Sequence, residues 1–325
     1  SLSGDGSTVA IGAPYNDGNG GASGHVHIYQ NISGAWTQIG QDIYGENPYD
    51  RSGFSVSLSS DGSIVAIGAP ENDDNYNQSG HVRIYQNISG VWTQIGQDIN
   101  GQVSYDSFGT SVSLSSDGNI VAIGAPSDLV NISRTGCVRI YENIGGFWSQ
   151  IGQDIDGESP YDRFGSSVSL SGDGSTVAIG APQNSGFSIN NSLGYVRIYE
   201  NIGSFWTQIS QDVDGENYND GSGSSVSLSG DGSTVAIGAP LNDDNFPEAG
   251  HVRIYDFYYN FNTSSPSSFA ITSCDSYEWE GVTYDSTGIY TNVYTGANGC
   301  DSVVNLDLTI NYSSSSTLAV TACDS

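Results

Sequence analysis

Short runs of alternating apolar and polar residues dominate the chain, and the segment 168–182 shows the pattern most clearly. Residues 168–170 and 176–179 alternate on either side of an Asp173-Gly174 pair. A period of two predicts strands with one buried face, and Asp-Gly between two such runs predicts a tight hairpin. A two-residue turn at this pair would place Leu170 opposite Val177 on one face of the ribbon.

The hairpin occurs five times, so the chain contains a tandem repeat. Successive copies are 56, 56, 56 and 58 residues apart, as the turn aspartates show: Asp5, Asp61, Asp117, Asp173 and Asp231. A leucine faces a valine across every turn, and four tryptophans keep the same spacing: Trp36, Trp92, Trp148 and Trp206. A repeat of this length predicts a solenoid, a propeller or an array.

Each copy is expected to contain four strands. In the second copy they cover residues 54–59, 63–69, 81–85 and 91–95, and polar loops connect them to one another and to the next copy. Four antiparallel strands per repeat are typical of a β-propeller blade. We therefore predict an all-β propeller of four-stranded antiparallel blades, with five repeats visible over residues 1–256. The fifth copy lacks a fourth strand, so we expect chain upstream of Ser1 to complete the ring.

Two motifs in the repeat resemble a known family. Phe108-Gly109 and Phe164-Gly165 are each followed by Gly-Ala-Pro, and together these pairs resemble the FG-GAP repeats that build the propeller of integrin α subunits. The copies also resemble tandem repeats of large secreted, adhesin-like proteins of marine Bacteroidetes. In one respect the chain departs from the family. The tight Asp-Gly turn stands where FG-GAP repeats carry an aspartate-rich calcium loop, so that calcium site does not transfer.

A different module follows the repeats. Residues 257–268 are predicted to be a linker, and residues 269–325 to form a small β module with the start of a second copy at Cys323. A core this small usually needs a covalent link, so we predict a Cys274–Cys300 disulfide and an oxidising, extracytoplasmic setting. The module resembles stalk repeats of Bacteroidetes surface proteins exported by type IX secretion, which also implies an extracellular or cell-surface location.

The charge balance limits the possible partners. The net charge is −29, with seven arginines and no lysine. Such a surface repels phosphate backbones and anionic lipids, so nucleic-acid and membrane-surface binding are not expected. No apolar run approaches the length of a membrane span, so direct membrane insertion is not expected either. The chain starts within a repeat and ends within a motif, which favours a segment of a longer polypeptide.

Acidic loops are the best candidates for binding, and Ca²⁺ is the cofactor they suggest. One set lies between the second and third strands of a copy, where carboxylates cluster at Asp73, Asp74, Asp243 and Asp244. A second set follows the fourth strand, at Asp154, Asp156 and Glu158. Several hard oxygen ligands on one short loop suit calcium. The alternative is that these loops are solvated acidic turns.

Other repeated residues are expected to be structural. Histidines 25, 81 and 251 share one position with Cys137 and Tyr195, and a metal or catalytic site would not accept these types interchangeably. The tryptophans are expected to pack in the core or between blades. The arginines of the third strand are expected to pair with carboxylates: Arg83, Arg139, Arg197 and Arg253.

No motif indicates catalysis. The sequence has no nucleophile elbow, no His-Glu-x-x-His and no phosphate-cradling glycine loop. The near-identical copies favour a non-enzymatic, extracellular, adhesin-like or surface structural protein that binds a glycan, a protein or copies of itself. Two alternatives remain open: a calcium-dependent carbohydrate-binding propeller of a larger secreted protein, and a fibre subunit.

Overall fold

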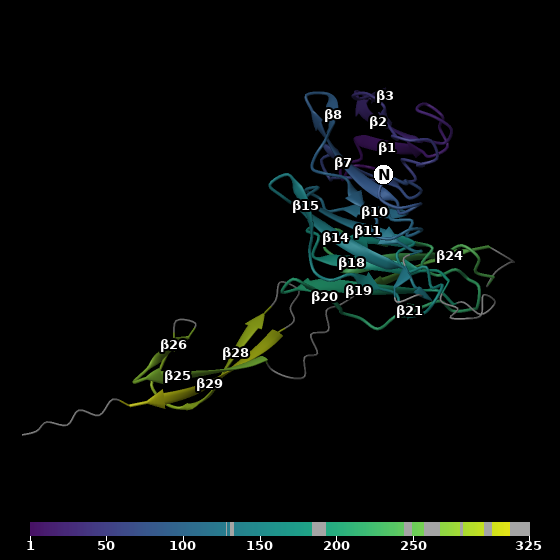
Figure 1. The fold of residues 1–325 in the computed structure, drawn as a ribbon. Helices are drawn as coiled ribbons and strands as arrows, with labels where there is room; N and C mark the ends of the chain where they lie inside the picture. The colour runs from purple at the N-terminus through teal and green to yellow at the C-terminus, as the bar shows by residue number, and fades with distance from the viewer. Residues whose placement is uncertain are drawn as a thin grey trace, which may run out of the picture. The chain divides into compact units, whose positions relative to one another are not determined.

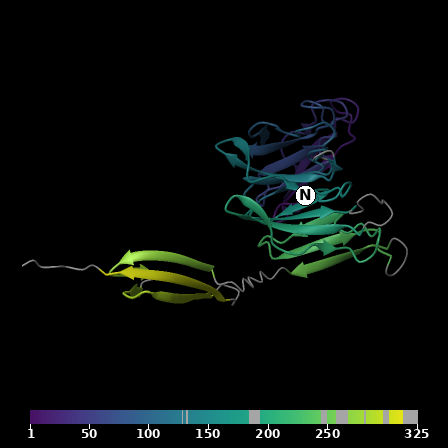
Figure 2. The same cartoon turned by 60° about the horizontal axis from the view of Figure 1, so that its bottom comes forward.

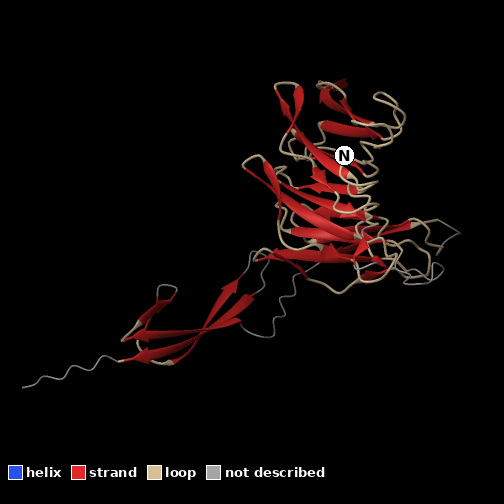
Figure 3. Cartoon of the chain, viewed as in Figure 1, coloured by secondary structure: helices blue, strands red, loops and turns tan. Residues whose placement is uncertain are grey.

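The computed structural model shows an all-β protein. It describes residues 1–127, 129–130, 133–183, 193–243, 249–256, 267–279, 282–295 and 301–312, and these residues form strands and loops without any helix (Figures 1 and 3). Hence no described segment is a helix that could cross a membrane. The chain divides into two compact units, Ser1–Phe257 and Tyr258–Ser325.

The first unit is a series of antiparallel sheets, one from each copy. In the second copy, β5 (Ser55–Leu58), β6 (Ile64–Ala69), β7 (His81–Ile88) and β8 (Val91–Gln94) pair in chain order. A further two-residue strand, β9 (Ile99–Asn100), also pairs with β7 and was not expected. It occupies the part of β7 that β8 leaves open, because β8 pairs only with residues 85–88.

The other copies follow the same plan. The first contains β1 (Thr8–Ala13), β2 (His25–Ile32), β3 (Ala35–Gln38) and β4 (Ile43–Tyr44). The third contains β10 (Ser111–Leu114), β11 (Ile120–Ala125), β14 (Cys137–Ile144), β15 (Phe147–Gln150) and β16 (Ile155–Asp156), with a side hairpin of β12 (Leu129–Val130) and β13 (Ser133–Arg134). The fourth contains β17 (Ser167–Leu170), β18 (Thr176–Ala181), β19 (Tyr195–Ile202), β20 (Phe205–Gln208) and β21 (Val213–Asp214). The fifth contains β22 (Ser225–Leu228), β23 (Thr234–Ala239) and β24 (His251–Asp256).

The predicted hairpin register is the one observed. Leu170 lies opposite Val177 and Val168 opposite Ile179, and the equivalent leucine–valine pairs form in all five copies. The turn itself differs from the expectation. A type I′ turn needs positive φ at both central residues, but of the Asp173-Gly174 pair only Gly174 has it, at 72°. Gly174 N donates to Ser171 O, so the turn is built on a wider loop.

The turn aspartates hold this loop together. Asp173 accepts hydrogen bonds from the Ser171 hydroxyl at 2.6 Å and from the Ser175 N–H at 2.9 Å. The same pair of contacts recurs at the other four aspartates: Asp5, Asp61, Asp117 and Asp231. The hydrogen bond from the Ser7 N–H is the main reason that the pKa of Asp5 falls to about 2. These carboxylates are therefore structural acceptors.

Successive copies lie side by side through their first strands. β5 contacts β1 and β10, and β17 contacts β10 and β22, so the sheets follow one another in chain order (Figures 1 and 2). Main-chain hydrogen bonds also connect each turn to the next, such as Ser60 N to Ser116 O and Ser116 N to Gly172 O, both 2.8 Å. A serine side chain adds a second link, because Leu114 N donates to Ser57 Oγ at 3.0 Å.

The glycines of the two repeated motifs meet at the boundary between copies. Gly124 belongs to Gly-Ala-Pro, and a Cβ added to it would overlap with the carbonyl oxygen of Gly165, which belongs to Phe-Gly of the following copy. Gly165 has φ of 87°, a conformation that favours glycine. The same approach recurs between Gly68 and Gly109 and between Gly180 and Gly223. The two motifs therefore lie where the backbones of neighbouring copies approach each other closely.

Tryptophans complete the boundary. The Trp148 indole lies over Gly96 of the preceding copy and donates from Nε1 to Ile95 O at 3.0 Å, while Gln97 hydrogen-bonds to both main-chain groups of Trp148. Trp92 and Trp206 make the equivalent Nε1 contacts with Ile39 O and Ile151 O. Trp36 is 49% exposed, since no described sheet packs against it. The expected inter-blade packing is therefore present at three of the four tryptophans.

The fifth sheet has three strands among the described residues, which agrees with the missing fourth strand in its sequence. The second unit is a separate sheet of β25 (Ser267–Cys274), β29 (Asp301–Asn311) and β28 (Gly288–Thr295), with a hairpin of β26 (Tyr277–Trp279) and β27 (Val282–Tyr284). Cys274 is exposed and forms no disulfide with any described residue. Its predicted partner Cys300 and Cys323 lie outside the described residues, as do residues 257–266 of the predicted linker.

Candidate functional site

The two polar loops of each copy meet along one edge of the first unit. Asn47, in the loop after β4, donates from Nδ2 to Asp74 Oδ1 at 3.0 Å, and Asp74 lies in the loop after β6 of the next copy. Asn72 is fully buried and donates to Asp50 and to Asp74, both at 3.1 Å. Adjacent copies therefore share a continuous edge of carboxylates and amides, which we call the loop edge.

The first set of predicted calcium ligands lies on this edge. Asp73 is exposed and accepts a hydrogen bond from Gln78 N at 2.5 Å, and the Asp74 carboxylate accepts from Asn47 and Asn72. Asp243 is exposed, and Asp244 lies outside the described residues. The carboxylates of Asp73 and Asp74 therefore accept hydrogen bonds that hold the conformation of this loop and join it to the preceding copy.

The second predicted set is divided between two ion pairs. Asp154 pairs with Arg139 of its own copy at 2.9 Å, whereas Glu158 pairs with Arg197 of the following copy at 2.8 Å. Asp156 is exposed, and one oxygen of it lies within 4.8 Å of ligand atoms of Asp154 and Cys137. Glu158 is therefore not part of the Asp154 group, because the following copy's arginine holds it.

These ion pairs belong to a repeated series along the third strands. Arg197 donates from Nε and Nη2 to the two oxygens of Asp212 at 2.8 and 2.7 Å, and Arg83 binds Asp98 in the same bidentate way. Each of these arginines also pairs with a glutamate of the preceding copy, and so does Arg253: the glutamates are Glu46, Glu158 and Glu216. The expected pairing of arginines with carboxylates is present, and it connects the copies.

A buried aspartate ends the loop after the fourth strand in every copy that has this loop. The four residues are at most 2% exposed: Asp50, Asp106, Asp162 and Asp220. Asp162 Oδ2 accepts hydrogen bonds from Ser159 N at 3.0 Å and from the Tyr195 hydroxyl at 3.1 Å, while its Oδ1 is buried without a hydrogen-bond partner. Burial raises the pKa of Asp162 to about 6, against these two hydrogen bonds.

This raised pKa predicts a pH dependence of stability. Between the ordinary pKa near 3.9 and about 6, the folded state binds more protons at Asp162 than the unfolded state does. The contribution of Asp162 to the free energy of unfolding is therefore largest below about pH 4 and is lost as the pH rises through 6. In Asp162→Asn, we expect the free energy of unfolding to change by about 2–3 kcal/mol less over this pH range than in the parent chain. Urea unfolding of both proteins at pH 4.5 and 7.5 measures it, and parallel pH profiles would contradict it.

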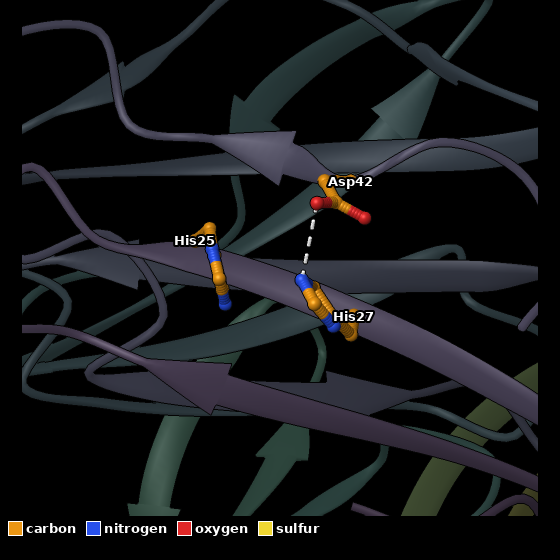
Figure 4. Close-up of side chains that lie close together, drawn as sticks. All are labelled: His25, His27 and Asp42. Carbon is orange, nitrogen blue, oxygen red and sulfur yellow. Dashed lines mark ion pairs between the residues drawn. The ribbon is translucent and has the colours of Figure 1, made fainter. Parts of the chain in front are cut away.

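The first copy differs from the others on its third strand. His27 stands where the other copies have an arginine, and its Nε2 lies 3.2 Å from Asp42 Oδ2 (Figure 4). His25 stacks on His27 with ring centroids 4.1 Å apart. Burial, together with the neighbouring His27, lowers the pKa of His25. Only the comparison of the repeats position by position would have singled out His27, because the residue has no motif around it.

Exposed tyrosines line the loop edge in strained backbone conformations. Tyr49, Tyr105 and Tyr161 occupy equivalent positions with φ of 71°, 69° and 68°. They are 69%, 43% and 52% exposed. Tyr49 N donates to Gly21 O at 2.8 Å and Tyr105 N to Asn77 O at 2.9 Å, so a neighbouring loop fixes the backbone at these two positions. We call these three residues the tyrosine row.

Known proteins resemble parts of this chain in sequence and in structure. A family model described as FG-GAP repeat matches residues 155–196. Human integrin alpha-6 is 31% identical over 139 residues, which are 39% of this chain and 12% of the integrin. Among solved structures, the periplasmic gluconolactonase of Pseudomonas aeruginosa is 17% identical, with a TM-score of 0.47 over 73% of this chain and 63% of that one. The β-propeller domain of the Trilobed protease from Pyrococcus furiosus is 11% identical, with a TM-score of 0.42 over 78% and 67%.

The chain thus spans a small part of the integrin and less than two thirds of the gluconolactonase. The matched segment 155–196 contains Phe164-Gly165 and Gly180-Ala181-Pro182, which are the residues that suggested the resemblance. The first unit is an all-β, propeller-like array of repeated antiparallel sheets. Residues 155–196 of it match the FG-GAP repeat, and part of the chain is distantly similar to an integrin alpha subunit.

Proposed function

We propose that residues 1–256 form a non-enzymatic, extracellular recognition module of adhesin-like type, which binds a surface glycan or protein along the loop edge. The observation that carries this proposal is the tyrosine row. A bulky residue with positive φ is a backbone outlier that costs on the order of 1–3 kcal/mol. An exposed ring recovers little of that cost through burial. Contact with a ligand would explain why exposed rings occupy a backbone conformation that costs free energy, whereas the stability of the fold does not explain it.

The chemistry of the row suits recognition. Tyrosine supplies a large, rigid and amphipathic contact surface at a small cost in conformational entropy, and it is enriched at binding surfaces. A side-chain amide lies beside one of the rings, because Asn77 donates from Nδ2 to the Tyr105 hydroxyl at 2.5 Å. A ligand on this edge would meet aromatic faces and hydrogen-bonding groups at the same spacing in successive copies. The row therefore favours a repetitive or extended ligand.

The fourth copy provides a substitution that keeps the backbone. Asn219 stands at the equivalent position with φ of 69°, and asparagine tolerates this conformation better than tyrosine does. We expect the triple variant Tyr49→Asn, Tyr105→Asn, Tyr161→Asn to keep its melting temperature and to lose at least tenfold in ligand affinity. Glycan arrays and binding to intact cells, followed by titration of each ligand found, measure this change.

The control is Tyr312→Asn, which removes a ring that is 69% exposed in the second unit. It should bind as the parent chain does. A triple variant with unchanged binding would refute the role of the row. The same titrations with Ca²⁺ and with EDTA test the calcium-dependent alternative. The exposure of Asp73 favours this alternative, but Asp73 and Asp74 already accept hydrogen bonds from the protein. We therefore expect the ligand affinity to be the same with Ca²⁺ as with EDTA.

Self-association is a second candidate because of the fifth sheet. Val252 and Ile254 of β24 are exposed, whereas their counterparts Val196 and Ile198 in the fourth copy are buried. An apolar sheet face of this kind is a typical contact surface. Sedimentation of the chain over a hundredfold range of concentration tests this candidate, and a constant monomer mass would exclude the fibre subunit.

A further inference from the structure

Three side chains of the first copy converge at one point of its sheet. His25 and His27 alternate on β2 and therefore share a face, and Asp42 immediately precedes β4, which pairs with β2 at His25 (Figure 4). One ligand atom from each residue lies within 4.8 Å of those from the other two. The side chains of His27 and Asp42 are 27% and 26% exposed, so solvent ions can reach the group.

Two ring nitrogens at this point have no hydrogen-bond partner. His25 Nδ1 and His27 Nε2 are both buried atoms without one. Asp42 Oδ2 lies 3.2 Å from His27 Nε2, but the geometry is that of an ion pair and not of a hydrogen bond. Buried polar atoms are rarely left unsatisfied. His81 Nδ1, at the position of His25 in the second copy, is also unsatisfied, so the atom of this group that needs an explanation of its own is His27 Nε2. A positive ion bound by both nitrogens and the carboxylate supplies one.

Neighbouring side chains orient the group. Tyr29 Oη lies 3.3 Å from His27 Nδ1, and with Nδ1 protonated the lone pair of Nε2 points towards Asp42. Asp42 accepts hydrogen bonds from Gln38 at 2.6 Å and from the Tyr44 hydroxyl at 2.9 Å. Partners that fix the tautomer of a histidine and the orientation of a carboxylate are typical of metal sites.

In other copies, an arginine neutralises the aspartate that corresponds to Asp42. In the second and fourth copies the equivalent aspartates, Asp98 and Asp212, receive a bidentate arginine. The first copy keeps the carboxylate and has lost the arginine. A histidine supplies a positive charge only in its protonated form, whereas a bound divalent cation always supplies one.

We propose that His25, His27 and Asp42 bind a divalent transition metal ion, with Zn²⁺ as the best match. Two imidazoles and one carboxylate with a fourth position open to solvent form a zinc ligand set. Bonds of about 2.0–2.1 Å in a tetrahedral site place neighbouring ligand atoms about 3.3 Å apart. The observed 3.2 Å between His27 Nε2 and Asp42 Oδ2 agrees with this spacing.

The repeat offers matched variants for the test. His27→Arg introduces the residue that the other copies carry at this position, so the variant should fold. His81→Tyr changes a histidine equivalent to His25 in a copy without a second histidine, and tyrosine stands at that position in the fourth copy as Tyr195. Calorimetric titration of the whole chain with Zn²⁺, after removal of metals, should give one strong site. We expect His27→Arg to weaken that site at least tenfold and His81→Tyr to leave it unchanged.

A second readout excludes weak binding to the acidic surface. Co²⁺ should give visible absorption bands of low-coordinate geometry in the parent chain and in His81→Tyr, but not in His27→Arg. Equal Zn²⁺ affinity in the parent and in His27→Arg, or no saturable site in the parent, would overturn the proposal. Loss of the site in Cys137→Ser would instead assign it to the group of Cys137, Asp154 and Asp156.

Discussion

Replacing Trp148 by alanine should lower the free energy of unfolding by about 3–5 kcal/mol, which is the usual cost of removing a buried aromatic side chain. The indole is 4% exposed and lies in the core cluster that the second and third copies share. Its loss would also leave Ile95 O without the hydrogen bond from Nε1. The boundary between the copies would thus lose apolar packing and a polar contact together.

Urea unfolding followed by circular dichroism measures this effect. The matched control is Trp36→Ala, because Trp36 occupies the same position in the first copy but is half exposed. The control should cost well under 1 kcal/mol, since surface substitutions away from special features change stability little. Equal losses for the two variants would show that the contact with the preceding copy is not what stabilises the boundary.

Gly124→Ala should have the second largest effect, for a steric reason. The added methyl would overlap with the carbonyl oxygen of Gly165 and approach Ser111 Oγ, and neither the backbone nor the packed strand can move away freely. We expect a loss of about 1–3 kcal/mol or more, as for other overpacked sites. Thermal unfolding by calorimetry measures it.

Gly230→Ala is the matched control for this prediction. A Cβ at Gly230 meets no atom within 4 Å, and its φ is not positive. We expect this variant to be at least as stable as the parent, because alanine reduces the entropy of the unfolded chain. A Gly124→Ala protein as stable as Gly230→Ala would refute the close contact between Gly-Ala-Pro and Phe-Gly of successive copies.

The fold was predictable where one residue type repeats at one spacing. The register of the hairpins follows from alternation alone, because shifting Leu170 by one residue would turn it away from the core. The role of the tryptophans follows from their constant period. The β9 type of strand was not predictable, since two residues such as Ile99 and Asn100 contain too little pattern to identify a strand.

The candidate site was less predictable because it depends on contacts between copies. Sequence proximity grouped Asp154 with Glu158, but the structure pairs them with different arginines, one of which lies in the following copy. The strain at Tyr49 is a property of the backbone, and no residue pattern predicts φ for a tyrosine. His27 was not predictable as a site residue, because a repeat pattern identifies residues that recur and His27 departs from its counterparts.

The contacts between copies have a consequence for how the array came to its present length. In the third copy, one side presents Gly124 of Gly-Ala-Pro and the segment 151–153, and the other side presents Gly109 of Phe-Gly and Trp148. Each set fits the complementary set of a neighbouring copy. Such a head-to-tail interface is complementary between any two neighbours. Duplication of one 56-residue segment of a gene therefore adds a unit that already fits both neighbours. Single substitutions such as the one at His27 can afterwards specialise one unit without altering the joints.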